Sequence, residues 1–375
     1  MNNSIWNVAT VFSGIGSAEW ALKRLNINHR LVFACDNGDR DISIDIDKEL
    51  EIIRSLPNSS EKKRYVDSLY SQKTRKKNHV KLAYLANHPL LDNDYFEDIR
   101  LFDGNDFRGK VDLLIGGSPC QSFSSIGSGR GFDDARGTLF YDFARLIHEI
   151  QPKAFIYENV RGITTHDNGQ TLSVIYSIFD NLGYDFDSRI LDSKDYGIPQ
   201  TRRRFFAIGY KKANKAMYSI PNIHKELKFT MQDFLEEKNA YGSLVFDVEN
   251  GKITLSNTPG NVDESYFLSE AVDKYVMSSG TKCFYQKPVV DLKIARPILA
   301  TMGNCHRAGI DNYITIEGKR RMLTEREALR LMGFTDEFKI VVSKAQTYRQ
   351  AGNAIVVDVM MSLIESIINY LDEVQ

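Results

Sequence analysis

The chain has 375 residues, of which 42% are hydrophobic and 26% charged, a composition typical of a globular protein with one large domain or two modest ones. A net charge of −1 does not by itself indicate a nucleic-acid-binding protein. There is no apolar run long enough to span a bilayer, and the polar start MNNSIWN is not that of a signal peptide. The cysteines at 35, 120, 283 and 305 form no C-x-x-C pair, which argues against a disulfide framework and a zinc cage and favours a reducing cytoplasm.

Short apolar segments typical of strands alternate with amphipathic segments typical of helices through the first 210 residues. Strands are predicted at WNVATVF (6–12), RLVFAC (30–35), VDLLIG (111–116), KAFIYEN (153–159) and RRFFAIG (203–209). Helices are predicted at SAEWALKRL (17–25), TLFYDFARLIHEI (138–150) and TLSVIYSIFDNLG (171–183). This alternation predicts an α/β fold with a doubly wound, mainly parallel sheet covered by helices on both faces.

Two segments interrupt the alternation. Residues 39–95 are highly charged with local helical character, which indicates an insertion, and residues 211–293 indicate a separate, smaller and irregular domain. Order returns at LTEREALRLMGF (323–334), where Thr324 and Glu327 predict a capping box at a helix start. A last amphipathic helix is predicted at 353–371, and residues 294–375 are expected to complete the domain formed by residues 1–210.

Basic residues cluster in two places despite the balanced net charge. One run extends from Lys62 to Lys81 inside the insertion, and a second from Arg202 to Lys215. We expect the first run to contact the phosphate backbone of a nucleic acid. The alternative is a solvated surface, which is what most such runs are.

Glycines mark a strand-to-helix turn in VFSGIGSAEW (11–20). Gly14 and Gly16 would let a ligand approach the backbone at a helix N-terminus. A dinucleotide fingerprint needs Gly or Ala at position 19, where Glu19 would instead repel a pyrophosphate. Asp36 follows the next strand, where a carboxylate can hold ribose hydroxyls. The pattern favours a nucleoside without a diphosphate, such as S-adenosylmethionine; the alternative is a simple tight turn.

Cys120 lies in the step SPCQ, past the end of the apolar run 111–116. A cysteine that faces a cleft near backbone N–H groups has a favoured thiolate and can act as a nucleophile. Glu158, in IYENV, comes just past the next strand, so the thiol and the carboxylate are expected at one edge of the sheet. The alternatives are a cysteine packed as a small hydrophobic residue and a glutamate that caps a helix.

The segment GIPQTRRRFF (197–206) places polar side chains at every second position. Gln200, Arg202 and Arg204 are therefore expected on one face of a strand. The alternative is an exposed edge that forms ion pairs with its neighbours.

The motifs FSGIG, SPCQS, ENV, QTRRR, RMLTEREALRLMGF and QAGNAIV occur in this order along the chain. In this order and at these distances they resemble the C5-cytosine DNA methyltransferase family, in its bacterial single-chain, restriction–modification form. The resemblance covers roughly residues 6–210 and 294–370. It implies the Rossmann-like fold of S-adenosylmethionine-dependent methyltransferases, with residues 211–293 as the target-recognition domain.

The resemblance also implies a mechanism. Cys120 would add to C6 of a flipped-out cytosine, so that C5 becomes a carbon nucleophile and takes the methyl group. Glu158 would hold ring N3 and the exocyclic amine and supply a proton. Arg202 would stabilise charge near O2, and Arg204 would support Glu158 and the active-site loop.

The cofactor implied by the resemblance is S-adenosylmethionine, with no metal. Family members contact it at the positions of Phe12, Gly14, Ile15, Gly16, Asp36, Asp98, Ile99, Pro119, Leu139, Phe334 and Asn353. For Phe12, Leu139 and Phe334 the alternative is core packing. The glycine-rich stretch 123–137 resembles the family's mobile loop, which closes over the DNA.

The expected partner is double-stranded DNA, with a restriction endonuclease of the same specificity as a possible second one. We expect a monomer in the bacterial cytoplasm, at the nucleoid, without membrane contact. A relative that methylates cytosine in transfer RNA is the first alternative; Gln200 and the long variable region favour DNA. A catalytically inactive DNA-binding homologue is the second, and the intact catalytic residues argue against it. A zinc deaminase is excluded, because Phe123 stands where its second cysteine would be.

Overall fold

The computed structural model describes residues 5–119, 138–212, 217–236, 262–281, 284–285, 287–304 and 307–374, and the backbone of two strands at 243–247 and 252–256. Cys120 and the glycine-rich stretch 123–137 lie outside the described residues. The candidate site is therefore described from the residues around Cys120, among them Pro119 and Glu158.

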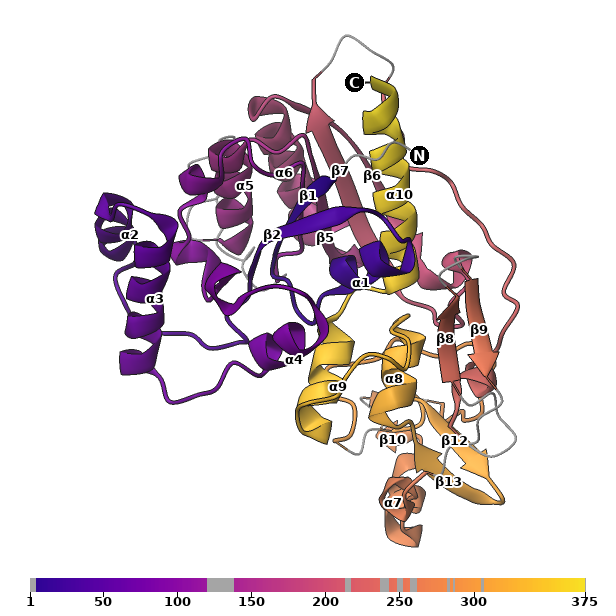
Figure 1. Ribbon diagram of the computed structural model, residues 1–375. Helices are drawn as coiled ribbons and strands as arrows, with labels where there is room; N and C mark the ends of the chain where they lie inside the picture. The colour runs from indigo at the N-terminus through magenta and orange to yellow at the C-terminus, as the bar shows by residue number, and fades with distance from the viewer. Residues whose placement is uncertain are drawn as a thin grey trace.

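A seven-stranded sheet forms the centre of the larger lobe (Figure 1), in the order β3-β2-β1-β4-β5-β7-β6. Its strands are β1 (Trp6–Val11), β2 (His29–Cys35), β3 (Tyr95–Phe96), β4 (Leu113–Gly116), β5 (Ala154–Val160), β6 (Tyr184–Asp192) and β7 (Arg203–Lys211). All neighbours pair in parallel except β7, which runs antiparallel to both β5 and β6. The predicted mainly parallel α/β sheet is confirmed, while β3 and β6 were not predicted.

Helices cover both faces of this sheet, because alternate residues of each strand point to opposite sides. Val8 and Ile156 share one core with α1 (Ser17–Arg24) and α10 (Val357–Val374). Phe155 and the other strand residues whose side chains point to the opposite face share the second core with α5 (Leu139–Ile150) and α6 (Gln170–Asn181). The two cores account for the mostly apolar sequences of the central strands.

The charged insertion folds into three helices beside the β2–β3 edge of the sheet (Figure 1). They are α2 (Ile46–Ser55), α3 (Ser59–Lys73) and α4 (His79–Asn87). Each begins at a residue whose side chain accepts a backbone N–H of the first turn: Asp45, Asn58 and Asn78. The insertion also has a small core of its own, which includes Ile53, Val66 and Tyr70.

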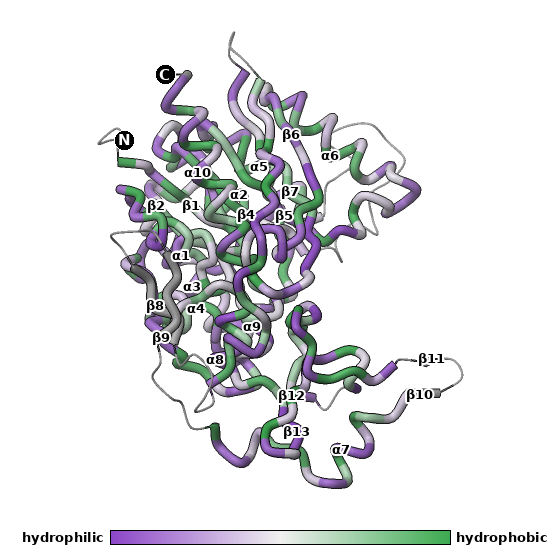
Figure 2. The backbone as a smooth tube through the Cα atoms, turned by 90° about the vertical axis from the view of Figure 1, so that its right-hand side faces the viewer, coloured by the Kyte–Doolittle hydropathy of each residue, from purple (hydrophilic) through white to green (hydrophobic). Residues whose placement is uncertain are grey.

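A smaller lobe projects from the sheet-containing lobe (Figure 2). It contains α7 (Glu270–Val276), β10 (Gly280–Thr281), β11 (Phe284–Tyr285), β12 (Tyr313–Ile316) and β13 (Lys319–Met322). A separate hairpin is formed by β8 (Ser243–Asp247) and β9 (Lys252–Ser256).

Packing places the limits of this lobe differently from the sequence pattern. Tyr218 and Phe234 belong to the core of the larger lobe, although they follow residue 211. The core of the smaller lobe joins Val276 to Ala308 and Tyr313, and so extends past residue 293.

The chain returns to the larger lobe through α8 (Glu325–Leu331), α9 (Lys344–Asn353) and α10. The predicted capping box is present: Thr324 Oγ1 accepts the Glu327 N–H at 3.1 Å, and Glu327 Oε2 accepts the Thr324 N–H at 2.8 Å.

The helical stretch Lys344–Glu373 corrects one expectation from the sequence. By length and composition it could cross a membrane, whereas no such run was expected. In the structure 61% of its most apolar window is buried inside the protein, because α10 packs against the sheet.

Candidate active site

The carboxyl ends of β1, β2, β4 and β5 meet at one edge of the sheet, because these strands are parallel. Open α/β sheets bind their ligands at this edge. It collects the glycine turn 14–16, Asp36, Pro119 and Glu158, which the sequence had singled out separately.

The glycine turn between β1 and α1 has a backbone that requires glycine at one position. Gly16 caps α1 with φ +84°, and a Cβ there would lie 2.0 Å from Nε2 of His88. The same histidine nitrogen lies 2.9 Å from the carbonyl oxygen of Ile15. Gly14 also has a positive φ, +54°, but a Cβ there would meet nothing within 4 Å. His88, from the insertion, thus holds the turn in place.

Asp36 links this turn to the loop that follows β2. Its Oδ2 accepts the Gly14 N–H at 2.9 Å and its Oδ1 accepts the Gly38 N–H at 2.8 Å. Burial raises the pKa of Asp36 to about 6, although both N–H groups favour the ionised form. Each carboxylate oxygen keeps a lone pair with which it can accept a ligand hydroxyl.

The other predicted cofactor contacts differ in exposure. Asp98 is buried and accepts the Tyr70 hydroxyl at 2.8 Å, with Arg100 Nη2 also at 2.8 Å. Phe334 is completely buried between Trp20 and Phe338, so the structure supports its alternative role in core packing. The remaining positions lie as follows: Phe12 and Leu139 half-buried, Ile99 buried, Pro119 and Asn353 exposed.

Glu158 lies inside β5, two residues before its end, rather than past the strand as the sequence suggested. Its Oε1 is 3.2 Å from Nε of Arg204, on the neighbouring antiparallel strand. Burial raises the pKa of Glu158, while Arg204 and then Arg202 act against the rise. A Cβ on Gly117 would lie 2.7 Å from Glu158 Oε2, so the carboxylate lies directly against the chain three residues before Cys120.

Asn159 fixes the same stretch of chain, a function that the sequence reasoning missed. Its Nδ2 donates to the Ser118 carbonyl at 2.8 Å and to the Tyr157 hydroxyl at 2.9 Å. The Ser118 hydroxyl is in turn 2.8 Å from that of Tyr157. The signal was present, because Asn159 is the middle residue of ENV.

Arg202 corrects the expectation that three side chains share one strand face. The strand β7 begins only at Arg203, and Gln200 forms an isolated bridge with Ala295. Arg202 is buried and donates to the carbonyls of Ile298, Gly352 and Ala354 at 2.7–3.0 Å. Its guanidinium therefore binds the returning chain.

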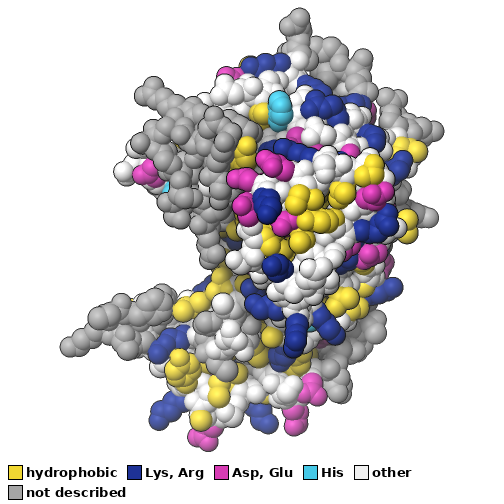
Figure 3. All heavy atoms as spheres, turned by 90° about the vertical axis from the view of Figure 1, so that its left-hand side faces the viewer, with side chains coloured by type: hydrophobic (Ala, Val, Ile, Leu, Met, Phe, Trp, Pro, Cys, Tyr) yellow, Lys and Arg dark blue, Asp and Glu magenta, His cyan; other side chains and the backbone are white. Residues whose placement is uncertain are grey.

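The basic run of the insertion divides into two groups. Three of its lysines already have acidic partners: Lys62 contacts Asp103 and Asp106, Lys63 contacts Asp67, and Lys81 contacts Asp92. The expectation of a phosphate contact is wrong for these. The other basic residues of the run are exposed and have no ion pair among the described residues: Arg64 and Lys73 in α3, and Arg75, Lys76 and Lys77 in the α3–α4 loop. Figure 3 shows the face of the molecule that lies on the left in Figure 1, and Lys and Arg side chains gather in its lower middle.

Comparison with known proteins adds independent information. The family model of the C-5 cytosine-specific DNA methylases matches residues 58–369. Type II methyltransferase M.NgoBI of Neisseria gonorrhoeae is 34% identical over 267 residues, 71% of this chain and 76% of its own length. Type II methyltransferase M1.ScrFI of Lactococcus lactis subsp. cremoris is 32% identical over 263 residues, 70% of this chain and 63% of its own length. Among solved structures, the S. pombe Dnmt2 methyltransferase has a TM-score of 0.66 at 19% identity and covers 98% of this chain and 100% of its own, a likeness of fold.

Proposed function

Because the chain belongs to the C-5 cytosine-specific DNA methylase family, we propose that it transfers a methyl group from S-adenosylmethionine to C5 of a cytosine within a specific DNA sequence. The names of its relatives, type II methyltransferases, support DNA rather than transfer RNA as the substrate. They also support a place in a bacterial restriction–modification system, where the product protects host DNA from an endonuclease of the same specificity.

Cys120 and Glu158 perform the addition to the base. The Cys120 thiolate forms a bond to C6 while Glu158 donates a proton to N3, so that electron density moves to C5. C5 takes the methyl group that the cofactor supplies. Loss of the C5 proton to a base then expels the Cys120 thiolate from C6, and the N3 proton returns to Glu158, which restores the neutral aromatic ring. The raised pKa of Glu158 suits a proton donor, since burial favours its neutral form.

The two arginines have different roles in this proposal. Arg204, 3.2 Å from the Glu158 carboxylate, holds that side chain and is close enough to stabilise charge on the base. Arg202 acts as a positioning residue, because its guanidinium is already bound to three carbonyls of the returning chain. The role of stabilising charge near O2, which the resemblance gave to Arg202, is therefore assigned to Arg204.

The cofactor fits the edge of the sheet between the glycine turn and Asp36. The Asp36 carboxylate accepts the ribose hydroxyls, and the turn formed by Gly14 and Gly16 lets the ligand approach the backbone. Phe12 and Leu139, both half-buried, form apolar walls. Asp98 and Ile99 lie at the end of the neighbouring strand β3.

DNA is bound between the two lobes, and residues of the smaller lobe select the sequence. The enzyme acts as a monomer in the cytoplasm. This mode of DNA binding, the monomeric state and the location are inferred from the family, not from the residues around Glu158.

One observation carries the proposal: the Glu158 carboxylate, with its raised pKa, lies against Gly117 three residues before Cys120. The test is Cys120→Ala, assayed with tritiated S-adenosylmethionine and mixed-sequence DNA. Methyl transfer should be abolished while the dissociation constant of S-adenosylmethionine changes by only a few fold, because the sulfur acts on the base. Substantial turnover by this variant would exclude the covalent mechanism.

A further inference from the structure

Two side chains, those of Asn78 and Arg40, hold the turn that follows Asp36. Asn78 Nδ2 donates to the Asp36 carbonyl at 2.9 Å, and Arg40 Nε donates to the Asn37 carbonyl at 3.0 Å. A Cβ on Gly38 would lie 2.2 Å from Asn78 Oδ1, so the turn and Asn78 are in close contact. The side chains of Asn78 and Arg40 therefore hold the backbone of Asp36, whose carboxylate is proposed to bind the cofactor.

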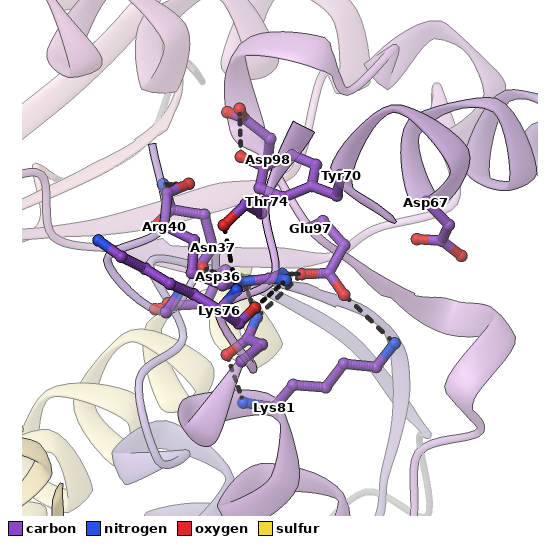
Figure 4. Close-up of polar contacts among 12 residues, drawn as sticks. Asp36, Asn37, Arg40, Asp67, Tyr70, Thr74, Lys76, Lys81, Glu97 and Asp98 are labelled. Carbon is purple, nitrogen blue, oxygen red and sulfur yellow. Dashed lines mark hydrogen bonds and ion pairs between the residues drawn. The ribbon is translucent and has the colours of Figure 1, made fainter. Parts of the chain in front are cut away.

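Both of these side chains are bound by one carboxylate oxygen. Glu97 Oε2 accepts Asn78 Nδ2 at 3.0 Å and also accepts Nη2 of Arg40, and its Oε1 lies 3.4 Å from Nζ of Lys81. Glu97, Arg40 and Asn78 are each more than nine-tenths buried. Figure 4 shows Glu97 at the centre of this network, with the Lys81 side chain directed toward it.

The network joins three separate parts of the chain. Arg40 belongs to the turn, Asn78 caps helix α4 of the insertion, and Glu97 directly precedes Asp98. Arg40 also donates to the carbonyl of Lys76 at 3.3 Å and lies 4.8 Å from the centre of the Tyr70 ring. Because the hydroxyl of Tyr70 binds Asp98, the same contacts reach the second predicted cofactor loop.

We propose that Glu97 is a positioning residue for the cofactor, which holds the Asp36 turn in its binding conformation through Arg40 and Asn78. The inference rests on the proposed function, since it takes Asp36 as the residue that binds the ribose. The insertion then supplies part of the wall of the cofactor site instead of forming an appendage. A buried carboxylate that receives three donors from two other segments, the turn and helix α4, can specify one arrangement of these segments around it.

The charge of Glu97 also acts on Asp36. Burial is the main cause of the raised pKa of Asp36, and the charges of Asp39 and Glu97 raise it further. The groups around Asp36 are the N–H donors of Gly14 and Gly38, Cys35 on β2, Asp39 and Arg40 of the turn, Asn78 of the insertion, and Tyr95 and Glu97 on the β3 side.

Two substitutions separate these effects. Glu97→Ala removes the shared acceptor and should raise the dissociation constant of S-adenosylmethionine roughly tenfold, as loss of a ligand-orienting group does in metal sites. Its kcat at saturating cofactor should stay within about twofold, because only cofactor binding is affected. Glu97→Gln keeps the size and one acceptor oxygen but removes the charge and leaves Arg40 without its counter-ion. Both changes lower the pKa of Asp36, so the acid limb of the plot of cofactor affinity against pH should move to lower pH.

Glu327→Gln is the matched control. Glu327 is also buried, and at the start of α8 it binds Arg321 Nη1 at 2.8 Å, Arg321 Nη2 at 2.6 Å and the Thr324 N–H at 2.8 Å. It should lower the melting temperature without moving the dissociation constant or the acid limb. Binding is measured by calorimetry between pH 5 and 8, with circular dichroism to confirm folding.

The outcomes are distinct. If wild-type protein binds S-adenosylmethionine but folded Glu97→Ala binds equally well, or the acid limb of Glu97→Gln does not move, the positioning role is wrong while the proposed function stands. If wild-type protein binds no S-adenosylmethionine, both are wrong.

Discussion

Arg204 Nε lies 3.2 Å from Glu158 Oε1, and the two side chains reach each other across the antiparallel strands β7 and β5. Burial raises the pKa of Glu158 and the arginine opposes the rise, so the protonation of this carboxyl depends on the pair rather than on Glu158 alone. Strand pairing sets the distance, because Val160 lies opposite Arg204 in the register.

Arg204→Gln should move the alkaline limb of the kcat–pH profile to higher pH. The substitution removes the cation that lowers the pKa of Glu158, so the carboxyl keeps its proton to higher pH. It should also lower kcat by roughly 10²-fold, since the cation next to the base is lost. Arg203→Gln is the control, because Arg203 is exposed and pairs with Asp192 instead. A profile that moves to lower pH, or equally in both variants, would contradict the pairing.

Arg202→Ala should destabilise the fold. The variant leaves the carbonyls of Ile298, Gly352 and Ala354 without their donor, at about 1–3 kcal/mol for each group that stays buried. Urea unfolding should show a clear fall in the midpoint, and Arg204→Ala should show a much smaller one. If Arg202→Ala kept wild-type stability and lost only kcat, Arg202 would act on the base after all.

Gly16→Ala should be far more damaging than Gly14→Ala. Both glycines have positive φ, which costs a non-glycine residue about 1–3 kcal/mol. Only at Gly16 does the new methyl group also lie 2.0 Å from the His88 ring, which must then move. We expect Gly16→Ala to lower both the melting temperature and the affinity for S-adenosylmethionine. Equal effects of the two substitutions would show that the contact with His88 is unimportant.

The exposed residues Lys73, Arg75, Lys76 and Lys77 are proposed to contact DNA phosphates. Neutralising all four should reduce the slope of log affinity against log salt by up to ~0.9 per lost contact. The matched control neutralises four exposed basic residues at the amino ends of the parallel strands, on the side of the sheet opposite to the candidate active site: Arg108, Lys110, Lys211 and Lys212. A slope that changes equally in both variants would leave the α3–α4 loop as a solvated surface.

The central strands and the position of the site could be predicted from the sequence. The strands β1, β2, β4 and β5 are rich in apolar residues because both of their faces are buried, and parallel pairing brings Asp36 and Glu158 to one edge. The strand β6 was missed because its sequence YDFDSRILD carries four charged residues, as an edge strand tolerates. The two residues of β3 are too short to produce a period.

The partners that the charged side chains contact could not be predicted from the sequence. Nothing in the run Arg202-Arg203-Arg204 indicates that the first binds backbone carbonyls, the second Asp192 and the third Glu158. Similarly, Lys62 finds Asp103 from 41 residues away, a pairing that depends on how the insertion packs. Local periodicity reports which face is buried, whereas ion pairs between distant segments are decided by tertiary structure.

Target recognition is proposed to lie in the smaller lobe, while the larger lobe performs the chemistry. The chemistry is the same at every cytosine, so the scaffold need not change with the recognised sequence. Base readout needs polar side chains that reach the major groove, and each good bidentate contact discriminates by roughly 1–3 kcal/mol.

The test is to exchange this lobe for that of a relative with another target, with boundaries taken from the packing. Residues 217–236 stay, because Tyr218 and Phe234 belong to the core of the larger lobe, and 294–304 stay, because Gln200 and Arg202 bind this segment. Residues 237–293 are exchanged together with 305–322, since Val276 packs against Ala308 and Tyr313 across that gap. The chimaera should methylate the relative's sites, mapped by sequencing 5-methylcytosine, with kcat within about tenfold of the parent. A shorter exchange of 237–293 alone should fold poorly, because it splits the core of the smaller lobe. If the active chimaera kept the original target, base readout would reside in the larger lobe, with the segment around Cys120 as the first place to look.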